Sequence, residues 1–347
     1  MSARPMAADS PLRYLAPAWF SIVMGLCGLS LTWTSATAVM GWQAGMGAQL
    51  IGALAAAIAL LLTIASVLRA TRYPAALKAD LLHPARHAMV AAMPVSLLLL
   101  TTVAARAHGA LPALKLAWML GAAWQFGVTL WVLRRWLHPV VPGENAATAF
   151  WASVTPALFI PVVGNVVVPI AGVQLGFPEW SAAQFGIGIV FWPVVLALLV
   201  VRLGLHGLWP ERLLPTIFIT VAPSSVGGLA ALELGVPTVF GWGAWGIGVF
   251  FLLWSASLFS RAWSQPFSIS FWAISFPLAA FTSLTLKLAQ GAPAWFHGLA
   301  VMLLALVSLL IAVLLLATWR GLRDGSLLAP ESGAPVANGG ACGTTAH

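Results

Sequence analysis

Long stretches without a charged residue dominate this chain and constrain its fold more than any motif does. The charge-free runs are 14–68, 88–105, 116–133, 145–178, 180–201, 213–232, 234–260, 262–286 and 288–319. A helix needs about 20 apolar residues to cross the hydrocarbon core of a membrane. Only 7% of the residues are charged, whereas a soluble domain carries about 25%. The sequence therefore predicts an all-α polytopic membrane protein and excludes a soluble globule.

The first charge-free run is too long for one helix, and the Gly-rich stretch 41–47 divides it. Ten spans result, near 17–40, 48–68, 88–106, 113–133, 150–172, 182–203, 213–234, 237–259, 268–290 and 295–318. Because the bilayer core offers the backbone no water, all ten are expected to be helices. We expect residues 1–16 to be a cytoplasmic N-terminal segment, 17–318 the membrane domain, and 319–347 a disordered cytoplasmic tail.

Lysine and arginine are distributed unevenly between the two sides that ten spans define. Three of them, Arg106, Lys115 and Lys287, fall on one side. The other side holds Arg4, Arg13, Arg69, Arg72, Lys78, Arg86, Arg134, Arg135, Arg202, Arg212, Arg261, Arg320 and Arg323. Cytoplasmic loops carry the excess of positive charge, so both termini are predicted to be cytoplasmic, in the inner (plasma) membrane. The net charge of +8 is scattered without a basic run, and we expect no nucleic-acid partner.

Prolines favour the odd-numbered spans. They are Pro17, Pro94, Pro156, Pro161, Pro169, Pro215, Pro223, Pro266 and Pro277, whereas Pro193 alone lies inside an even span. A proline kinks a helix and frees a carbonyl, which neighbouring helices or water must satisfy in a membrane. The pattern predicts five helical hairpins, with an inner ring of kinked odd helices around a central pore. The alternative is that membrane helices simply contain more proline than soluble ones.

Motifs for catalysis and cofactor binding are missing from the sequence. It contains no G-x-x-x-x-G-K-[ST] and no H-E-x-x-H, which would indicate a nucleotide or a catalytic zinc. The histidines lie near loops or span ends, and their spacing makes no metal-ligand set. An enzyme would also need polar residues that converge at depth. We therefore predict a conduit for a solute, with no enzymatic activity, cofactor or metal.

Two charges fall near the outer ends of predicted inner helices. Glu233 ends the seventh span and Lys287 lies near the end of the ninth. They could form a vestibule pair in which Lys287 attracts anions, or each could extend to the membrane interface on its own. The sequence leaves both interpretations open. Arg106, at another span end, is expected to extend to the interface.

Five short motifs occur in order along the predicted membrane domain. They are Pro17–Leu26, Asp80 with His83-Pro84-Ala85-Arg86, Gly164-Asn165, Ala222-Pro223-Ser224-Ser225 and Phe271–Ala279. Together they resemble the tellurite-resistance/dicarboxylate transporter family. That family includes bacterial tellurite resistance protein A, fungal malate and sulfite transporters, and the plant guard-cell slow anion channels. The resemblance extends from about residue 11 to residue 318.

The resemblance implies five hairpins around a pore, a homotrimer with one pore in each subunit, and a pore gate at Phe276. An aromatic ring in a narrow lumen offers an ion no hydrogen bond, and apolar constrictions of this kind gate by dewetting. Pro277 follows directly and biases the backbone of Phe276 away from the helical region, which could aim the ring at the axis. The alternative is that Phe276 is one of many packing phenylalanines.

Further residues on the odd spans are candidates for the pore lining. They are Phe20, Ser21, Ser96, Thr155, Phe159, Phe218, Ser224 and Ser275. The sequence places no buried ring of Arg or Lys among them. Anion selectivity would then follow from lumen size, hydroxyl groups and helix N-termini.

The leading hypothesis is a passive anion channel or channel-like transporter for small inorganic or organic anions, embedded in membrane lipid. The alternative within the same family is a proton- or ion-coupled exporter of C4-dicarboxylates, sulfite or tellurite. Coupling normally requires a titratable relay at depth, and only Glu233 comes close to providing one. A third possibility is a membrane scaffold or receptor without transport.

Overall fold

The computed structural model describes residues 10–137 and 145–329, and its regular elements in these ranges are all helical. Nine of the described helices are long and apolar enough to cross a membrane. A tenth crossing results if the bent pair Ala147–Ser153 and Pro156–Gly172 counts as one broken span, with a bend of 75°. The prediction of an all-α polytopic membrane protein is confirmed. The domain boundary at residue 16 stays a prediction, and 1–9 and 330–347 lie outside the described residues.

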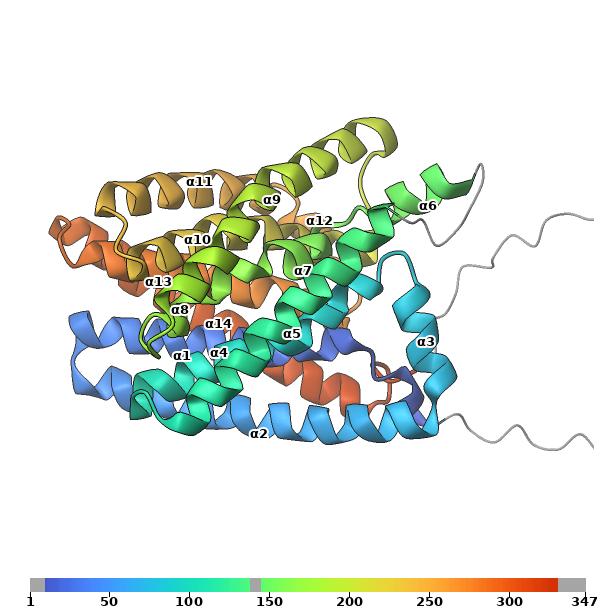
Figure 1. Ribbon diagram of the computed structural model, residues 1–347, viewed down its shortest axis with the longest axis horizontal. Coiled ribbons are helices and arrows are strands. Elements are labelled where there is room, and N and C mark those ends of the chain that lie inside the picture. The colour runs from blue at the N-terminus through green and yellow to red at the C-terminus, as the bar shows by residue number, and fades with distance from the viewer. Residues whose placement is uncertain (1–9, 138–144, 330–347) are drawn as a thin grey trace, which may run out of the picture.

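The membrane helices run back and forth between two ends of the bundle (Figure 1). We call them the α3 end, where the short helix α3 (Pro74–Leu82) lies, and the Gly41 end, where the inner helices finish. The first two hairpins are α1 (Phe20–Met40) with α2 (Trp42–Arg72), and α4 (Ala92–His108) with α5 (Pro112–Leu137). The last two are α10 (Ala222–Glu233) with α11 (Thr238–Ala256), and α13 (Ser275–Ala289) with α14 (Ala294–Arg323).

The middle hairpin contains the broken span. Its inner arm is assembled from the 3-10 turns η4 (Pro156–Leu158) and η5 (Gly164–Val167) and the short helices α7 (Phe159–Val163) and α8 (Pro169–Gly172). Its outer arm is the single long helix α9 (Pro178–His206). Two further short helices lie towards the α3 end (Figure 1): α6 (Asn145–Ser153), which precedes the bend of the broken span, and α12 (Phe259–Trp263).

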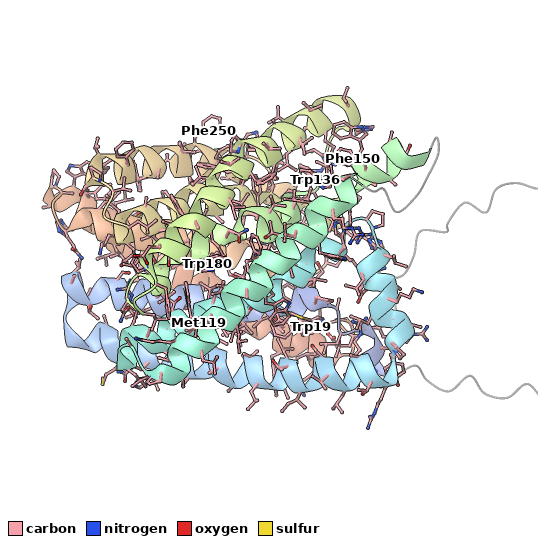
Figure 2. All side chains as sticks on the ribbon, viewed as in Figure 1. Trp19, Met119, Trp136, Phe150, Trp180 and Phe250 are labelled. Atoms are coloured by element: carbon pink, nitrogen blue, oxygen red, sulfur yellow. The ribbon has the colours of Figure 1, made fainter. Side chains whose placement is uncertain are left out.

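The odd and even spans differ sharply in burial. Four odd spans are 61–83% buried over their most apolar window, whereas the five even spans are only 22–39% buried. The fifth odd span, Pro156–Gly172, is buried along most of its length. Large apolar side chains on the even helices point outward, as Figure 2 shows for Phe250 and Trp180, which are 64% and 47% exposed. This is the pattern predicted for an inner ring within an outer, lipid-facing ring.

Each inner span begins with a 3-10 segment. These segments are η2 (Pro17–Trp19), η3 (His87–Ala91), η4, η6 (Glu211–Val221) and η7 (Ile269–Ile274). In four of the spans a proline lies in the first turn of the α-helix that follows, at Pro94, Pro161, Pro223 and Pro277. A proline is tolerated there because the first helical N–H groups have no acceptor within their own helix. The kinks predicted at these prolines are therefore the points where the backbone changes from 3-10 helix to α-helix.

Side chains of outer helices satisfy the carbonyls that the broken span leaves free. Nε2 of Gln125, on α5, donates to the carbonyl oxygens of Ile160 and Pro161, at 3.1 Å in each case. The hydroxyl of Thr129 donates to the same Pro161 oxygen at 2.7 Å. Nδ2 of Asn165 donates in turn to Thr129 Oγ1 at 2.8 Å. These contacts supply the partners that irregular backbone requires inside a membrane.

Several predicted boundaries differ from the structure. The first hairpin turns at one residue, Gly41, whose φ of +79° suits glycine, so α2 begins at Trp42 instead of near residue 48. The helix α14 continues to Arg323, past the predicted start of a disordered tail at residue 319. Arg320 and Arg323 stabilise this last turn because cations interact favourably with the C-terminal end of a helix dipole.

Candidate functional site

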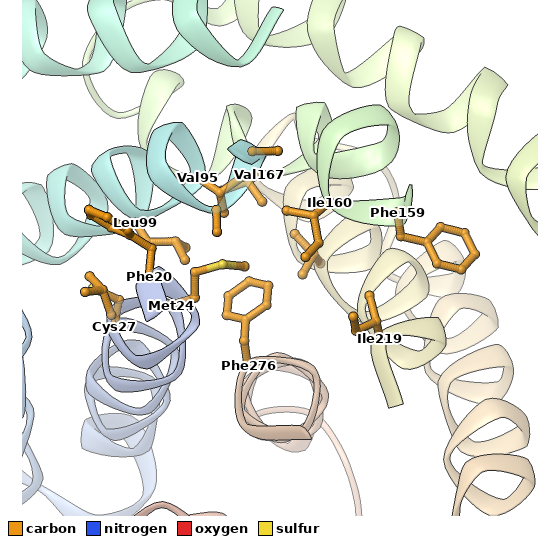
Figure 3. Packing of buried hydrophobic residues seen from close by; sticks show 14 of the residues in the cluster. Phe20, Met24, Cys27, Val95, Leu99, Phe159, Ile160, Val167, Ile219 and Phe276 are labelled. Atoms are coloured by element: carbon orange, nitrogen blue, oxygen red, sulfur yellow. The ribbon is translucent and has the colours of Figure 1, made fainter. Parts of the chain in front are cut away.

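The ring of Phe276 lies at the centre of the bundle. Figure 3 shows it rising from α13 into a space bounded by Met24 of α1, Val95 of α4 and Ile160 of α7. The side chain is 9% exposed. Because Phe276 is the second residue of α13, directly after η7 and before Pro277, its direction is set where the backbone changes from 3-10 to α-helix.

Two cavities meet at this ring. The larger, of about 380 Å³, opens towards the α3 end and takes its wall from all five inner spans. The smaller, of about 200 Å³, lies towards the Gly41 end between α1, α4, α10 and α13. Phe276 and Val226 line both cavities. The aromatic ring thus forms part of the partition between them.

Close packing of α1 against α13 holds the ring in place. A Cβ atom added to Gly28 would lie 3.1 Å from Cδ2 of Phe276 and 3.0 Å from Cβ of Ala279. One turn further along α1, the hydroxyl of Thr32 donates to the carbonyl oxygen of Ala279 at 2.9 Å. Thr32 also contacts the hydroxyl of Ser283 at 2.9 Å. Gly28 and Thr32 are four residues apart and share one helix face, and the sequence analysis did not single them out.

Most hydroxyl groups in the wall of the large cavity already donate to a backbone carbonyl. The hydroxyls of Ser21 and Thr216 both donate at 2.6 Å to backbone carbonyls in their own segments. Ser270 donates to the carbonyl of Arg212 at 2.7 Å. Thr155 differs, because its buried hydroxyl, in a side chain 4% exposed, has no partner among the described residues. Thr155 therefore holds an uncommitted donor in the cavity wall.

Three of the candidate lining residues, Ser21, Thr155 and Phe159, line the large cavity. The remaining five lie outside the lining of both cavities: Phe20, Ser96, Phe218, Ser224 and Ser275. Ser96 donates to the carbonyl of Phe20 at 3.1 Å and thereby joins α4 to the start of α1. Ser224 and Ser275 donate to carbonyls one turn earlier in their own spans. The Phe218 ring packs edge-on against Phe259, with centroids 6.2 Å apart.

Positive charge lies at the α3 end of the large cavity, where Arg86 and Arg212 line it. Arg86 is held by Asp80, whose Oδ1 accepts from Nη1 at 3.0 Å. Oδ2 of the same carboxylate accepts from Arg69 at 2.6 Å, and Asp80 itself is only 2% exposed. Two guanidinium groups thus share one buried carboxylate. This network explains why an aspartate accompanies the His83-Pro84-Ala85-Arg86 motif.

The small cavity contains a triad of charges, which we define as Arg106, Glu233 and Lys287. Nη2 of Arg106 lies 2.8 Å from Oε1 of Glu233, and Nζ of Lys287 lies 4.0 Å from the same oxygen. The structure thus brings together the two residues singled out as vestibule charges. Arg106 was expected to extend to the membrane interface, and that stays a prediction; its side chain is 31% exposed and pairs with the carboxylate. Sequence alone could not show that α4 and α10 place these side chains at one cavity.

The described residues contain no group of three or more His, Cys, Asp or Glu side chains that could hold a metal ion. The features of the site are instead two cavities, a ring between them and clustered positive charge at either end. Such an arrangement can admit and attract anions.

Comparisons with known proteins agree with these features. The family model described as voltage-dependent anion channel, SLAC1, matches residues 14–319. An uncharacterized transporter of Methanocaldococcus jannaschii is 25% identical over 63% of this chain and 69% of its own length. A sulfite efflux pump of Arthroderma otae is 25% identical over 65% of this chain and 68% of its own length.

A plant protein also matches part of the chain. The S-type anion channel SLAH2 of Arabidopsis thaliana is 27% identical over a stretch that makes up 38% of this chain and 26% of the plant protein. The family match covers every inner span and both cavities, and it agrees with the resemblance that the sequence motifs carry. The chain belongs to the SLAC1 family of voltage-dependent anion channels.

Proposed function

We propose that this protein is a passive anion channel, or a channel-like transporter, for small inorganic or organic anions, and that Phe276 is its gate. The observation that carries the proposal is the position of the Phe276 ring, which lines both cavities. An ion that passes the ring must shed water and finds no hydrogen bond there in exchange. Displacement of the ring would join the two cavities and let a hydrated anion pass.

The electrostatics of the site favour anions. The helices α1, α4, α10 and α13 begin beside the large cavity, and the N-terminal end of each carries partial positive charge from its helix dipole. Arg86 and Arg212 add full positive charges there, and Arg106 and Lys287 do so in the small cavity. Positive potential raises the local concentration of anions at both ends of the path.

Orientation and driving force complete the proposal. The excess of lysine and arginine at the α3 end supports an orientation with both termini in the cytoplasm and the large cavity at the inner face of the plasma membrane. With the inside negative, a monovalent anion gains about 2.3 kcal/mol per 100 mV on leaving the cell. Efflux therefore needs neither a nucleotide nor a catalytic step. The family resemblance supports a homotrimer with one pore in each subunit.

A coupled carrier for sulfite or a C4-dicarboxylate is the second candidate. The similarity to a sulfite efflux pump favours it, and Glu233 supplies a titratable group that lines the small cavity. In such a carrier, a proton on Glu233 would move with or against the anion, and flux would depend on the pH gradient. A passive channel would show no such dependence.

The deciding experiment is current and flux measurement on the full-length protein reconstituted into lipid bilayers. Chloride, nitrate, sulfite and malate would be compared, with and without a pH gradient. A channel gives currents that reverse at the Nernst potential of the anion whatever the pH gradient. Currents that follow the proton gradient would identify the carrier, and the lack of flux for every anion would leave a scaffold or receptor.

A further inference from the structure

We infer that Arg106 and Lys287 form an anion-binding site in the small cavity, and that the carboxylate of Glu233 occupies it as a tethered competitor. The inference rests on the proposed function, because the competitor matters only if anions pass through this cavity. The ligand class is a small monovalent anion such as chloride or nitrate, which matches the single charge of the carboxylate it replaces.

Both cations face one oxygen of the carboxylate. Oε1 of Glu233 lies 2.8 Å from Nη2 of Arg106 and 4.0 Å from Nζ of Lys287. The three side chains come from three inner helices, α4, α10 and α13. Two positive charges thus share one negative charge at one point of the path, as they would share a bound anion.

The cations keep donors for another ligand. Lys287 is too far from the carboxylate for a hydrogen bond, and no hydrogen bond of its ammonium occurs among the described residues. Its side chain is 46% exposed. Arg106 uses Nη2 for Glu233 and for a long contact of 3.3 Å to the carbonyl of Ile170. An anion that displaced the carboxylate would take over its N–H group on Nη2, and the three N–H groups on Nε and Nη1 and the ammonium of Lys287 remain as further donors.

The hydroxyls of the small cavity are engaged elsewhere. Thr34, Ser35 and Thr37 of α1 line it, and each donates its proton to a backbone carbonyl of the same helix, at 2.7–3.0 Å. A threonine or serine bonded in this way presents only lone pairs to the cavity. Arg106 and Lys287 are the charged donors that this wall offers to an anion that has passed Phe276.

The position of Glu233 also favours a role beyond packing. It is the last residue of α10, where the negative end of the helix dipole disfavours a carboxylate. The carboxylate stays there because the two cations compensate it. When a free anion takes its place, the carboxylate must swing towards solvent, which its side-chain exposure of 22% at the cavity edge permits.

The test measures entry of chloride from the small-cavity side. Currents of Phe276→Ala protein in bilayers would be recorded while chloride is raised on that side alone. Glu233→Gln, which removes the charge at nearly constant shape, should lower the half-saturating chloride concentration about fivefold, the effect of one unit charge near 4 Å in water-like surroundings. Lys287→Gln should raise the half-saturating chloride concentration by a similar factor. When chloride is raised on the other side instead, neither substitution should change the half-saturating concentration much.

Glu179→Gln is the matched control. Glu179 is an exposed residue in the first turn of α9, at the same end of the bundle, and it does not line the small cavity. It should leave the half-saturating concentration unchanged. If Glu233→Gln behaves as this control does, Glu233 is an ordinary salt-bridge partner and the inference is wrong. Glu233→Asp shortens the side chain but keeps its charge. Its half-saturating concentration should lie between those of the parent and Glu233→Gln, and it replaces Glu233→Gln in the test if the glutamine variant does not fold.

Binding can be followed without any current. Broadening of the ³⁵Cl NMR line by detergent-solubilised protein should increase in Glu233→Gln and fall in Lys287→Gln, each in an otherwise unchanged chain. Equal broadening in both variants and the parent would overturn the inference. If chloride binds as described but Phe276→Ala protein carries no current, the proposed function fails while the binding site stands.

Discussion

Gly28 of α1 faces the ring of Phe276 so closely that a Cβ atom on the glycine would lie 3.1 Å from the Cδ2 atom of the ring. The same Cβ would lie 3.0 Å from Cβ of Ala279, on the next turn of α13. Both distances are shorter than ordinary van der Waals contact. The resting position of the ring therefore depends on the absence of a side chain at residue 28, and the partition between the cavities is set by α1 as well as by α13.

Gly28→Ala is expected to open a leak. The added methyl group must move the ring aside and also shift α13 slightly at Ala279, because it would press on both. We expect basal anion current in bilayers to rise severalfold, and the stability to fall by about 1–3 kcal/mol, as is typical of overpacking in a dense core. The measurements are single-channel recording and thermal unfolding in detergent.

Gly127→Ala provides the control for that substitution. Gly127 lies within α5, and a Cβ there would have no neighbour within 4 Å. The change should leave the current unaltered and stabilise the helix by up to about 1 kcal/mol. If both alanines gave the same current, contact between residue 28 and the ring would have no part in gating.

Phe276→Ala should increase anion current at least tenfold. Removal of the ring takes away the apolar group that lines both cavities, so water can fill the joined space and an anion keeps part of its hydration. Phe276→Leu, which keeps an apolar side chain, should give a smaller increase. The currents would be measured at equal protein density in bilayers with symmetrical chloride.

Phe250→Ala is the matched control for the gate, because Phe250 is 64% exposed on the outer surface of α11. It should change neither current nor selectivity. A parent protein that already conducts as strongly as the Phe276→Ala variant would contradict the gate.

The sequence predicted the helical spans and the place of Phe276 because both leave local signals. Charge-free runs mark the spans, and the motif around Pro277 marks the ninth of them. The start of α2 was predicted too late because several glycines follow Gly41, whereas a single residue with positive φ is enough to reverse the chain.

The side-chain contacts of the site could not be predicted, because they depend on helix rotation. Ser96 and Ser275 were expected in the pore lining on the strength of their spans, but each hydroxyl donates to a backbone carbonyl. Arg106 is more than one hundred residues from Glu233 in the sequence, and only the packing of the inner helices brings them to 2.8 Å. Periodicity reveals which helices are apolar, but not which of their faces meet.

Thr155→Val should reduce the passage of strongly hydrated anions more than that of weakly hydrated ones. Thr155 lines the large cavity, and its hydroxyl, buried in the wall, lacks a partner among the described residues, so a passing anion that reaches it can recruit it in place of a water molecule. We expect the chloride-to-iodide permeability ratio to fall about two- to tenfold, the effect of one neutral hydrogen bond. Reversal potentials in the Phe276→Ala background would measure it.

Thr216→Val is the comparison, since Thr216 lines the same cavity but donates to the carbonyl of Leu213. It should leave the permeability ratio near that of the parent. An equal fall in both variants would mean that the cavity selects by its size and not through the free hydroxyl of Thr155.

Asp80→Asn should destabilise the protein by about 3–5 kcal/mol, the cost of removing one partner from a buried ion pair. The carboxylate is 2% exposed and holds Arg69 at 2.6 Å and Arg86 at 3.0 Å, so its loss leaves two guanidinium groups without compensation. Glu211→Gln is the control, because the Glu211–Arg261 pair is about half exposed and should contribute less than about 1 kcal/mol. Thermal unfolding in detergent would compare the two variants with the parent. A Tm for Asp80→Asn equal to that of Glu211→Gln would show that water reaches the buried carboxylate, and that the end of the large cavity is held by the backbone of the His83–Arg86 motif instead of by its charges.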